Sequence, residues 1–582
     1  MSGFVGIAWR DKNFNKSVLD GIEKNSRNFE KFVCDSFYVL LKRKMKFYKD
    51  IIFFETQRCF FLIEGVILNS LELIKKYKSE SFGETIALMH EKNGDVFFKE
   101  FRGSFAGMTY WKNTHKLILY TDHIGSKQIF FSLKDRNLIF SSNGNRLVNL
   151  LRKFQIDISL NIDSAYSLLT FGYMLESHTI FNEIEKLMGG HYLEYLDGQV
   201  QIVQYYRLSN VPDNKITEND AVERLDMLFK KAVTRAFEKD LEYGYRHLVA
   251  LSGGLDSRMT TWVAHDLGYS SRIVNFTFSQ TNYFDETIAK RIATDLRHEW
   301  IFKSLDNGLF LRNVEDIVRL TFGGVLYCGS AHFKSMLDLL NLESFGLIHT
   351  GQLGDVIVGT YYSSPRPNKP YSISSGAYSF SPLSAKISKD YIKYDYENEE
   401  IFKFYNRGFS GMNSGLMLAQ EKTETYSPFY DVDVMDFCLS LPLRFRFGHR
   451  LYIKWILSKY PGASHYVWEK IKTKPSVLMV NILGKRVPVR KLLPKVIELI
   501  LRKIGLLKDN INTKKHMNPF GFWYNTNEDL KMFFDDYFIK NIDFLGDFPE
   551  LMNDCKNLWE NGLVVDRCQV ITLLAIMKVY FG

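Results

Sequence analysis

Proline, cysteine and long apolar runs are all scarce in this chain of 582 residues, and each scarcity excludes a class of protein. The 13 prolines argue against Pro-rich linkers, so domains should pack directly on one another. The six cysteines lie far apart without a C-x-x-C pair, which argues against a zinc ribbon or a disulfide framework. No run reaches the roughly 18 apolar residues of a membrane span, and the N-terminus lacks the apolar stretch of a signal peptide. We therefore expect a cytoplasmic protein without a transmembrane segment.

The composition is that of an ordinary globular chain, with 46% hydrophobic, 24% charged and 15% aromatic residues. This balance excludes intrinsic disorder and collagen-like repeats. The length allows two or three domains, each large enough to bury its own core. The net charge of +9 is too small over so long a chain to indicate nucleic-acid binding.

Two regions of different periodicity meet near residue 210. Before it, short apolar or alternating runs indicate a β-rich, layered domain. These runs lie at 51–56, 59–69, 95–101, 116–122, 128–133, 137–142 and 189–208. After it, a helical pattern at 218–240 precedes an apolar strand at 247–251, which is typical of an α/β domain with a parallel sheet. We expect one domain over 1–210 and a second over 211–582.

A basic segment at 485–503 interleaves lysines and arginines with aliphatic residues at roughly helical spacing. Such a helix either packs on its own domain with a basic outer face or lies on an anionic membrane surface. Pro488 and Pro494 would interrupt one long helix, so we favour the packed helix.

The sequence Ser-Gly-Gly-Leu-Asp-Ser at 252–257 lies between the apolar strand and a helical pattern. Glycines let the backbone approach a phosphate, and a helix N-terminus offers N–H groups and a positive dipole end. Asp256 fits among phosphates if Mg²⁺ lies between them, because this ion prefers carboxylate and phosphate oxygens. The alternative is a plain turn with Asp256 as a helix cap. Since strand, glycine pair, acid, hydroxyl and helix occur together, we favour a nucleotide-phosphate site.

These residues resemble the PP-loop of ATP pyrophosphatases, enzymes that adenylate an oxygen of their substrate and release pyrophosphate. The segment from Thr350 to Val356 is similar to the second signature of the class B, glutamine-hydrolysing asparagine synthetase family. Further segments match landmarks of this family at 101–111, 121–132, 171–195, 278–296 and 424–431. The resemblance extends over about residues 1–475 and weakens beyond them.

The resemblance implies a two-domain protein of mixed α/β and α+β class. Its N-terminal domain would be an αββα sandwich of the Ntn-hydrolase type, and its second domain a parallel-sheet PP-loop domain with a divergent helical part from about residue 476. It also implies ATP and Mg²⁺ as cofactors and, more weakly, a homodimer. The residues implied for ATP are Ala250, Ser252, Gly253, Gly254, Asp256, Ser257, Phe278, Thr350 and Gly351, and those implied for Mg²⁺ are Asp256 and Asp355.

The glutaminase pocket that the resemblance implies is degenerate in this chain. Family members expose a Cys nucleophile after Met1, whereas this chain has Ser2. Glu64 stands where the family has the Asn of its oxyanion site, and Arg102 stands where an Asp holds the glutamine α-amine. Arg102 would place a positive charge where an ammonium should bind, and a hydroxyl is a weaker nucleophile than a thiolate. We expect a domain kept for structure and not for glutamine hydrolysis.

The synthetase signature at 350–356 departs from the family pattern less than the glutaminase pocket does. The family's Glu between the two glycines is Gln352, which cannot accept a proton as a general base, and Val356 replaces an acidic residue. A family Lys that stabilises pyrophosphate corresponds to Lys470, Lys472 or Lys474, among which we favour Lys470. Glu424 is retained in its motif, either as a catalytic residue or as a supporting one. The catalytic candidates are therefore Lys470, Gln352 and Glu424.

Two hypotheses for function follow. In the first, the protein is a ligase that adenylates a carboxylate with Mg-ATP and couples it to ammonia or another amine, as the divergent relatives that close β-lactam rings or cyclise peptides do. In the second, it is a non-catalytic or regulatory ATP-binding homologue, which Gln352 and Val356 motivate. We favour the ligase because both Mg²⁺ acids and the whole phosphate loop are present. Aspartate is only the family's default substrate.

Overall fold

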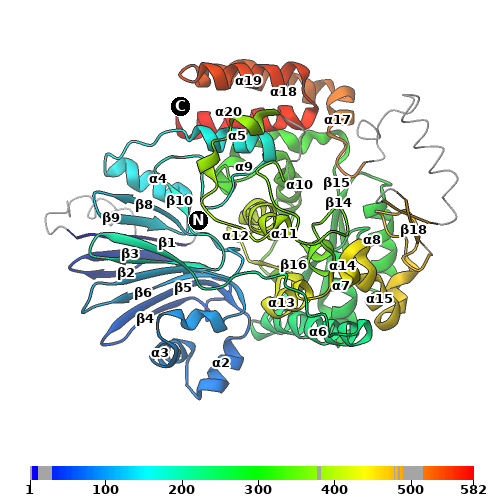
Figure 1. Ribbon diagram of the computed structural model, residues 1–582, viewed down its shortest axis with the longest axis horizontal. Coiled ribbons are helices and arrows are strands. Elements are labelled where there is room, and N and C mark those ends of the chain that lie inside the picture. Colours follow the sequence, from blue (N-terminus) through cyan, green and yellow to red (C-terminus); the bar gives the residue numbers. More distant parts are fainter. Residues whose placement is uncertain (1–2, 11–28, 376–381, 478, 483–484, 489–515) are drawn as a thin grey trace.

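The computed structural model describes residues 3–10, 29–375, 382–477, 479–482, 485–488 and 516–582 (Figure 1). The β-rich N-terminal half lies beside the α/β half, and helices of the C-terminal segment cover the latter's upper side in this view. Within the described part of the chain, no helix is both long enough and apolar enough to cross a bilayer.

The N-terminal half contains two six-stranded antiparallel sheets that pack face to face. The first has the strand order β10 (Glu185–Lys186), β8 (Phe130–Lys134), β9 (Asn137–Ser141), β1 (Gly3–Ala8), β3 (Phe37–Lys42), β2 (Glu30–Cys34). The second has the order β12 (Gln199–Gln204), β11 (His191–Leu196), β7 (Leu117–Thr121), β6 (Gly103–Trp111), β5 (Cys59–Ile67), β4 (Ile52–Glu55). Alternate residues of these strands form the core between the sheets, including Phe4, Val39 and Phe140 of the first sheet and Leu62 and Met108 of the second.

Helices cover the outer face of each sheet. The second sheet packs against α2 (Ser70–Tyr77) and α3 (Phe82–Asn93). The first packs against α4 (Gly144–Lys153), and α5 (Ile162–Phe171) belongs to the same apolar cluster. The expected αββα sandwich is therefore confirmed.

The second half is built on a five-stranded sheet in which every pair is parallel. Its order is β15 (Glu299–Ser304), β14 (Ile273–Ser279), β13 (Arg246–Ala250), β16 (Phe345–His349), β17 (Thr425–Tyr426). Along the chain, β14 and β15 follow β13 on one side of it in the sheet, and β16 and β17 then lie on the other side of β13. The strand order therefore reverses between β13 and β16. In open parallel sheets, ligands bind at the carboxyl ends of the strands beside such a reversal.

Helices pack against this sheet and extend it into a larger α-helical body. They are α6 (Glu218–Glu242), α7 (Asp256–Ala264), α8 (Phe284–Asp295), α9 (Val314–Thr321), α10 (Tyr327–Leu337), α11 (Glu399–Lys403), α12 (Asn413–Gln420), α13 (Val432–Leu439), α14 (Leu443–Arg446), α15 (Arg450–Lys459), α17 (Phe520–Thr526), α18 (Glu528–Asn541), α19 (Pro549–Asn561) and α20 (Val564–Tyr580). The part beyond residue 476, expected to be helical, begins instead with a hairpin of β18 (Met479–Ile482) and β19 (Lys485–Pro488) before helices α17 to α20. The rest of the basic segment, 489–503, lies outside the described residues.

One apolar core spans the two halves. A single cluster of buried side chains includes Val5 and Ile7 of β1 together with Leu248 of β13 and Leu573 of α20. The rings of Phe181 and Tyr580 lie 5.2 Å apart at this junction. The two halves therefore pack directly on each other, as the scarcity of proline predicts.

A buried ion cluster also joins the halves. Glu424 of the C-terminal half accepts hydrogen bonds from Lys44 at 2.8 Å and from Lys127 at 3.0 Å, both from the N-terminal half. Lys127 lies 3.2 Å from Glu64 as well, and the Glu424 side chain is only 2% exposed. Burial alone would raise the pKa of Glu424, but the charges of Lys127 and Lys44 hold it below its ordinary value.

We expect Glu424→Gln to lower the free energy of unfolding by about 3 kcal/mol, because removing one charge of a buried cluster leaves its partners uncompensated. Asp536→Asn is the matched control, since Asp536 pairs with Lys540 at 2.9 Å while both side chains are about two-thirds exposed. This control should change stability by less than about 1 kcal/mol. Urea unfolding of the three proteins measures the difference, and equal effects would contradict the assignment of Glu424 to the junction.

Candidate functional site

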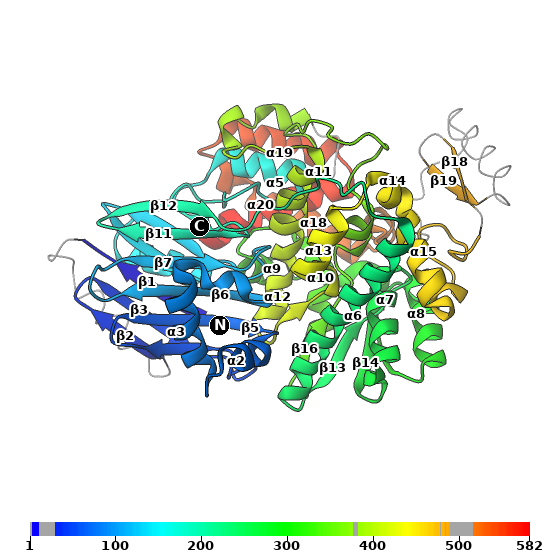
Figure 2. The same ribbon diagram turned by 60° about the horizontal axis from the view of Figure 1, so that its bottom comes forward.

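Two loops meet at the carboxyl ends of β13 and β16, where the strand order reverses (Figure 2). The first, here called the phosphate loop, comprises residues 252–257 and leads into α7. The second, here called the acid loop, comprises residues 350–356 and follows β16 directly. Because β13 and β16 are hydrogen-bonded neighbours, their succeeding loops emerge side by side. The expected nucleotide residues of both loops are thus brought together.

The phosphate loop is shaped by its own hydroxyls. The backbone N–H of Ser252 donates to Ser257 Oγ at 3.0 Å, and the N–H of Gly254 donates to Ser252 Oγ at 3.2 Å. The N–H of Gly253 donates to the Asp285 carboxylate at 2.8 Å. Helix α7 then begins at Asp256, and its N-cap Leu255 has no side-chain acceptor for the N–H groups of the first turn. This combination of backbone donors, hydroxyls and a helix start suits an anion.

Glycines allow the acid loop to lie against the start of α7. A Cβ atom on Gly351 would lie 2.2 Å from the main-chain nitrogen of Ser257. A Cβ atom on Gly354 would lie 2.7 Å from the Asp256 carboxyl carbon. Real Cβ contacts are never so short, so only glycine permits this approach at either position.

The approach places two acids next to each other. Asp256 accepts a hydrogen bond from the Tyr452 hydroxyl at 2.8 Å. Burial, together with the negative charge of Asp355, raises the pKa of Asp256 to about 8. Two carboxylates in repulsion beside a loop of backbone donors form a ligand set suited to a hard divalent cation, which would relieve that repulsion. Asp256 and Asp355 therefore fit the expected magnesium site.

The three candidate lysines lie in a tight turn after α15. The N–H of Trp468 donates to Thr473 O at 2.8 Å, and Lys472 adopts a left-handed backbone conformation with φ 54°. Lys470 Nζ lies 3.7 Å from an Asp355 carboxylate oxygen. Since both side chains are about half exposed, this pair can open to admit an anion. Lys470 thus lies within ion-pair distance of Asp355.

Gln352 is held at both ends of its amide. Its Oε1 accepts from the Tyr430 hydroxyl at 3.0 Å, and its Nε2 donates to Met412 O at 3.3 Å. Its main-chain oxygen accepts from the Ser427 hydroxyl at 3.0 Å. These bonds fix the acid loop on Met412, directly before α12, and on the segment after β17.

The other implied nucleotide residues flank the loops. The N–H of Thr350 donates to Tyr426 O at 2.8 Å, and the Thr350 carbonyl accepts from the Thr260 hydroxyl at 3.1 Å. The ring of Phe278, at the end of β14, lies 4.9 Å from that of His332. Ala250 ends β13 immediately before the phosphate loop. The Phe278 side chain is half-buried, and an aromatic ring is a group on which a heterocyclic base can stack.

Four residues that support these loops were not identified from the sequence: Arg258, Asp285, Tyr452 and Glu469. The fully buried Arg258 guanidinium donates to Gly253 O at 3.1 Å and to Val467 O at 2.7 Å, which ties the phosphate loop to the chain before the lysine turn. The N–H of Glu469 donates to Gly253 O at 3.2 Å. Burial lowers the pKa of Arg258 to about 10 and raises that of Asp285 to about 6. Two signals were visible in the sequence: Arg258 directly follows the Ser-Gly-Gly-Leu-Asp-Ser run, and Asp285 lies in the segment 278–296 that resembles the family.

Glu64 and Arg102, two of the residues expected in a degenerate glutaminase pocket, make contacts within the protein. Glu64 accepts from the Ser142 hydroxyl at 2.8 Å and lies 3.2 Å from Lys127 Nζ. Arg102 donates to Asp433 of the C-terminal half at 2.9 Å. Arg102 thus connects the two halves directly, whereas Glu64 does so only through Lys127, which also binds Glu424. Ser2 lies outside the described residues.

Comparisons with known proteins agree with the resemblance. A model of the glutamine amidotransferase domain family matches residues 53–206. The chain is 24% identical over 307 residues to putative asparagine synthetase 2 (glutamine-hydrolyzing) of Methanocaldococcus jannaschii, which covers 51% of this chain and 58% of that protein. It is 22% identical over 273 residues to asparagine synthetase 1 (glutamine-hydrolyzing) of Bacillus subtilis, which covers 46% and 42%. These matches span about half the length of the relatives.

Among solved structures, the glutamine phosphoribosylpyrophosphate amidotransferase of B. subtilis, complexed with ADP and GMP, is similar at 9% identity and a TM-score of 0.25. The alignment covers 52% of this chain and 85% of that chain.

We expect Gly351→Ala to destabilise the protein by about 1–3 kcal/mol, because the new methyl group would overlap the main chain of α7. Gly329→Ala is the matched control: Gly329 lies in α10 with no heavy atom within 4 Å of its potential Cβ. In a helix, Ala is favoured over Gly by about 1 kcal/mol, so the control should be neutral or stabilising. Thermal unfolding compares the two, and a Gly351→Ala midpoint equal to that of the control would refute the close approach of the loops.

Proposed function

Since the chain is a divergent member of the glutamine-hydrolysing asparagine synthetase family, with a glutamine amidotransferase domain in its N-terminal half, we propose that it is an ATP-dependent ligase that joins a carboxylate to an amine. The observation that carries the proposal is the pair of acids, Asp256 and Asp355, against a loop of backbone donors at the reversal point of a parallel sheet.

The proposed reaction has two steps. A carboxylate oxygen of the substrate attacks the α-phosphorus of ATP, the bond between the α-phosphorus and its bridging oxygen to the β-phosphate breaks, and pyrophosphate leaves. The amine then attacks the acyl carbon, the carbon–oxygen bond to the phosphate breaks, and AMP leaves. The surplus amine proton passes to solvent. The products are an amide, AMP and pyrophosphate.

Each residue of the two loops and of the lysine turn would take the part in the reaction that its position allows. The N–H groups at the start of α7 and the hydroxyls of Ser252 and Ser257 would bind phosphate oxygens in place of their present internal hydrogen bonds. Lys470 would neutralise charge that develops on the departing pyrophosphate. Gln352 cannot act as a base, so it would hold the acid loop against the substrate.

Mg²⁺ would be held by Asp256 and Asp355, and when bound it would offset negative charge on the phosphate oxygens. Tyr452 would keep the Asp256 carboxylate oriented toward the acid loop through its hydroxyl. The hydrogen bond leaves the other oxygen of Asp256 available as a ligand.

We infer that ammonia or a larger amine, and not glutamine, is the nitrogen donor. Arg102 is bound to Asp433, and Glu64 is bound to Ser142 and Lys127, so neither offers the groups that would grip a glutamine substrate. The acyl substrate is a small-molecule carboxylate, for which aspartate is the family's default. The domain that would supply ammonia serves as a structural partner.

Pyrophosphate release from Mg-ATP tests the proposal, with aspartate or other carboxylates and with ammonium, amines or glutamine. We expect release that requires ammonium or an amine and does not respond to glutamine. Asp256→Asn and Asp355→Asn should each lower the rate at least about 100-fold, because each removes charge stabilisation at the reacting phosphate. Asp536→Asn is the surface control. ATP binding without release in any pairing would contradict the ligase and favour a regulatory ATP-binding protein.

Ser2→Cys should not create a glutaminase. The thiol would restore the nucleophile, but the contacts of Arg102 and Glu64 would still leave the pocket without groups for the α-amine and the oxyanion. Glutamate release from glutamine is the measurement. Release by this single variant above that of the unmodified protein would overturn the interpretation of the N-terminal half.

A further inference from the structure

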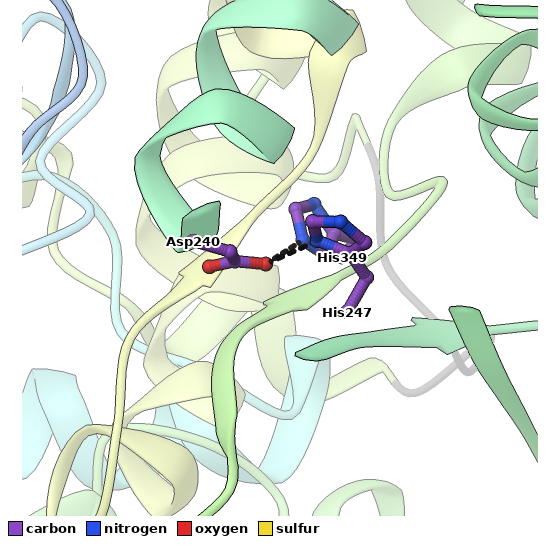
Figure 3. Close-up of side chains that lie close together, drawn as sticks. All are labelled: Asp240, His247 and His349. Carbon is purple, nitrogen blue, oxygen red and sulfur yellow. Dashed lines mark hydrogen bonds and ion pairs between the residues drawn. The ribbon is translucent and has the colours of Figure 1, made fainter. Parts of the chain in front are cut away.

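Three buried side chains lie behind the two loops, between α6 and the sheet (Figure 3). Asp240 is near the end of α6, His247 is in β13, and His349 is the last residue of β16. All three side chains are fully buried. A single carboxylate oxygen, Asp240 Oδ2, lies 2.8 Å from His247 Nδ1 and 2.7 Å from His349 Nε2. The other oxygen accepts the backbone N–H of Leu347 at 2.8 Å.

These contacts determine where the protons are. An ionised carboxylate only accepts hydrogen bonds, so the ring nitrogens that face Asp240 carry hydrogens. The opposite nitrogens, His247 Nε2 and His349 Nδ1, are buried without a hydrogen-bond partner among the described residues. A second proton on either ring would be an unsatisfied buried donor, which is costly. The cluster is therefore an aspartate with two neutral imidazoles of opposite tautomer.

A bound metal ion is the competing explanation, since the three facing atoms lie within 4.8 Å of one another. Two observations favour hydrogen bonds. The separations of 2.7 and 2.8 Å are those of N–H···O bonds. Histidines that bind metals also donate their second N–H to a partner, and the outer nitrogens of this cluster have none among the described residues.

The cluster coincides with an irregularity between the two strands that carry the loops. Arg246 pairs with Phe345, but Leu248 pairs with Ile348, so that three residue steps on β16 correspond to two on β13. Such a bulge shifts every following residue by one position relative to its neighbour strand. The residues that follow on β16 are those of the acid loop.

The Asp240 carboxylate occupies this irregularity. It accepts the N–H of Leu347, a main-chain donor on the β16 side of the shifted pairing. It also lies so close to Gly346 that a Cβ there would be 2.0 Å from its Oδ1, which requires glycine at this position. Phe237 of α6 stacks on the His349 ring at 4.0 Å and holds it in place.

We propose that Asp240 is a positioning residue that, through His247 and His349, sets the register of β16 against β13 and thereby the position of Asp355 relative to Asp256. The consequence for catalysis rests on the proposed function. The consequence for structure does not rest on it, since without the Asp240 carboxylate the N–H of Leu347, beside the shifted pairing, loses its acceptor. A one-residue slip would move the acid loop by about 3.3 Å along the strand.

The variants that test this use the full chain. His349→Gln retains an Nε2–H donor toward Asp240, whereas His349→Leu removes it, so the pair separates hydrogen bonding from volume. Asp240→Asn tests the carboxylate itself. His298→Gln is the matched control, because His298 is a buried histidine of the same domain that hydrogen-bonds Asn275 at 2.8 Å, on the β14 side of the sheet.

Hydrogen–deuterium exchange gives a readout that is independent of turnover. We expect Asp240→Asn and His349→Leu to increase exchange in peptides that cover 345–356, while His349→Gln and His298→Gln leave these peptides close to the unmodified protein. Unchanged exchange in a folded Asp240→Asn or His349→Leu protein would overturn the positioning role. If Asp240→Asn does not fold, the exchange of His349→Leu alone decides whether the positioning role holds.

Pyrophosphate release then tests the consequence for catalysis. His349→Leu should lower kcat about tenfold to 100-fold with a smaller change in the KM for ATP, because misplaced acids affect the reacting phosphate more than ground-state binding. His349→Gln should recover most of that loss. If hydrogen–deuterium exchange changes as expected but even the unmodified protein shows no turnover, the proposed function is rejected and the assignment of the strand register is retained. Normal kcat in His349→Leu would reject the catalytic consequence.

Nitrogen NMR of protein labelled with ¹⁵N-histidine tests the protonation pattern, with His247→Gln and His349→Gln assigning the signals. We expect one Nδ1–H and one Nε2–H tautomer, unchanged by stoichiometric Zn²⁺. A shift of both signals on addition of Zn²⁺ would identify the cluster as a metal site and overturn the proposal.

Discussion

The close approach of two carboxylates is the constraint on which the site depends. Burial, and after it the negative charge of Asp355, raises the pKa of Asp256 to about 8, yet the main chain holds the two loops in contact. The fold compensates for this with glycines that permit the contact and with Tyr452, Arg258 and Lys470, which bind the loops from outside. A pair of acids held together in this way favours a cation between them, which is the physical basis for the Mg²⁺ of the proposed reaction.

The N-terminal half contributes charged side chains to the junction with the C-terminal half. Lys44 and Lys127 bind Glu424, and Arg102 binds Asp433, so three basic side chains of the N-terminal half connect it to the C-terminal half. Buried ion pairs add little net stability when compared with apolar packing, but they are intolerant of a wrong partner. They therefore specify one relative placement of two halves that already share an apolar core.

How much could be predicted from the sequence depended on how local each feature is. The phosphate loop was visible because its strand, glycines, acid and helix are consecutive, and the sandwich was visible because strands alternate over short runs. The partners of the loops were not, since Tyr452 and Val467 lie 196 and 209 residues from the side chains that they bind. The contacts of His247 and His349 with Asp240 could not be predicted, because a single histidine in an apolar strand does not indicate which helix its side chain will contact. The paired strands β18 and β19 were missed because Lys and Arg between aliphatic residues fit a helical period as well as a strand.

The placement of α20 has a consequence for how the chain is made. This helix is buried on nearly all sides, and its Tyr580 hydroxyl bonds Asn145, which is 435 residues earlier in the sequence. The ribosome thus exposes the surface around α4 and α5 long before the helix that covers it has been synthesised. Contacts of such sequence separation slow folding and leave apolar surface accessible in the meantime. The surface of α4 and α5 that α20 covers therefore stays exposed until the last residues of the chain have been synthesised.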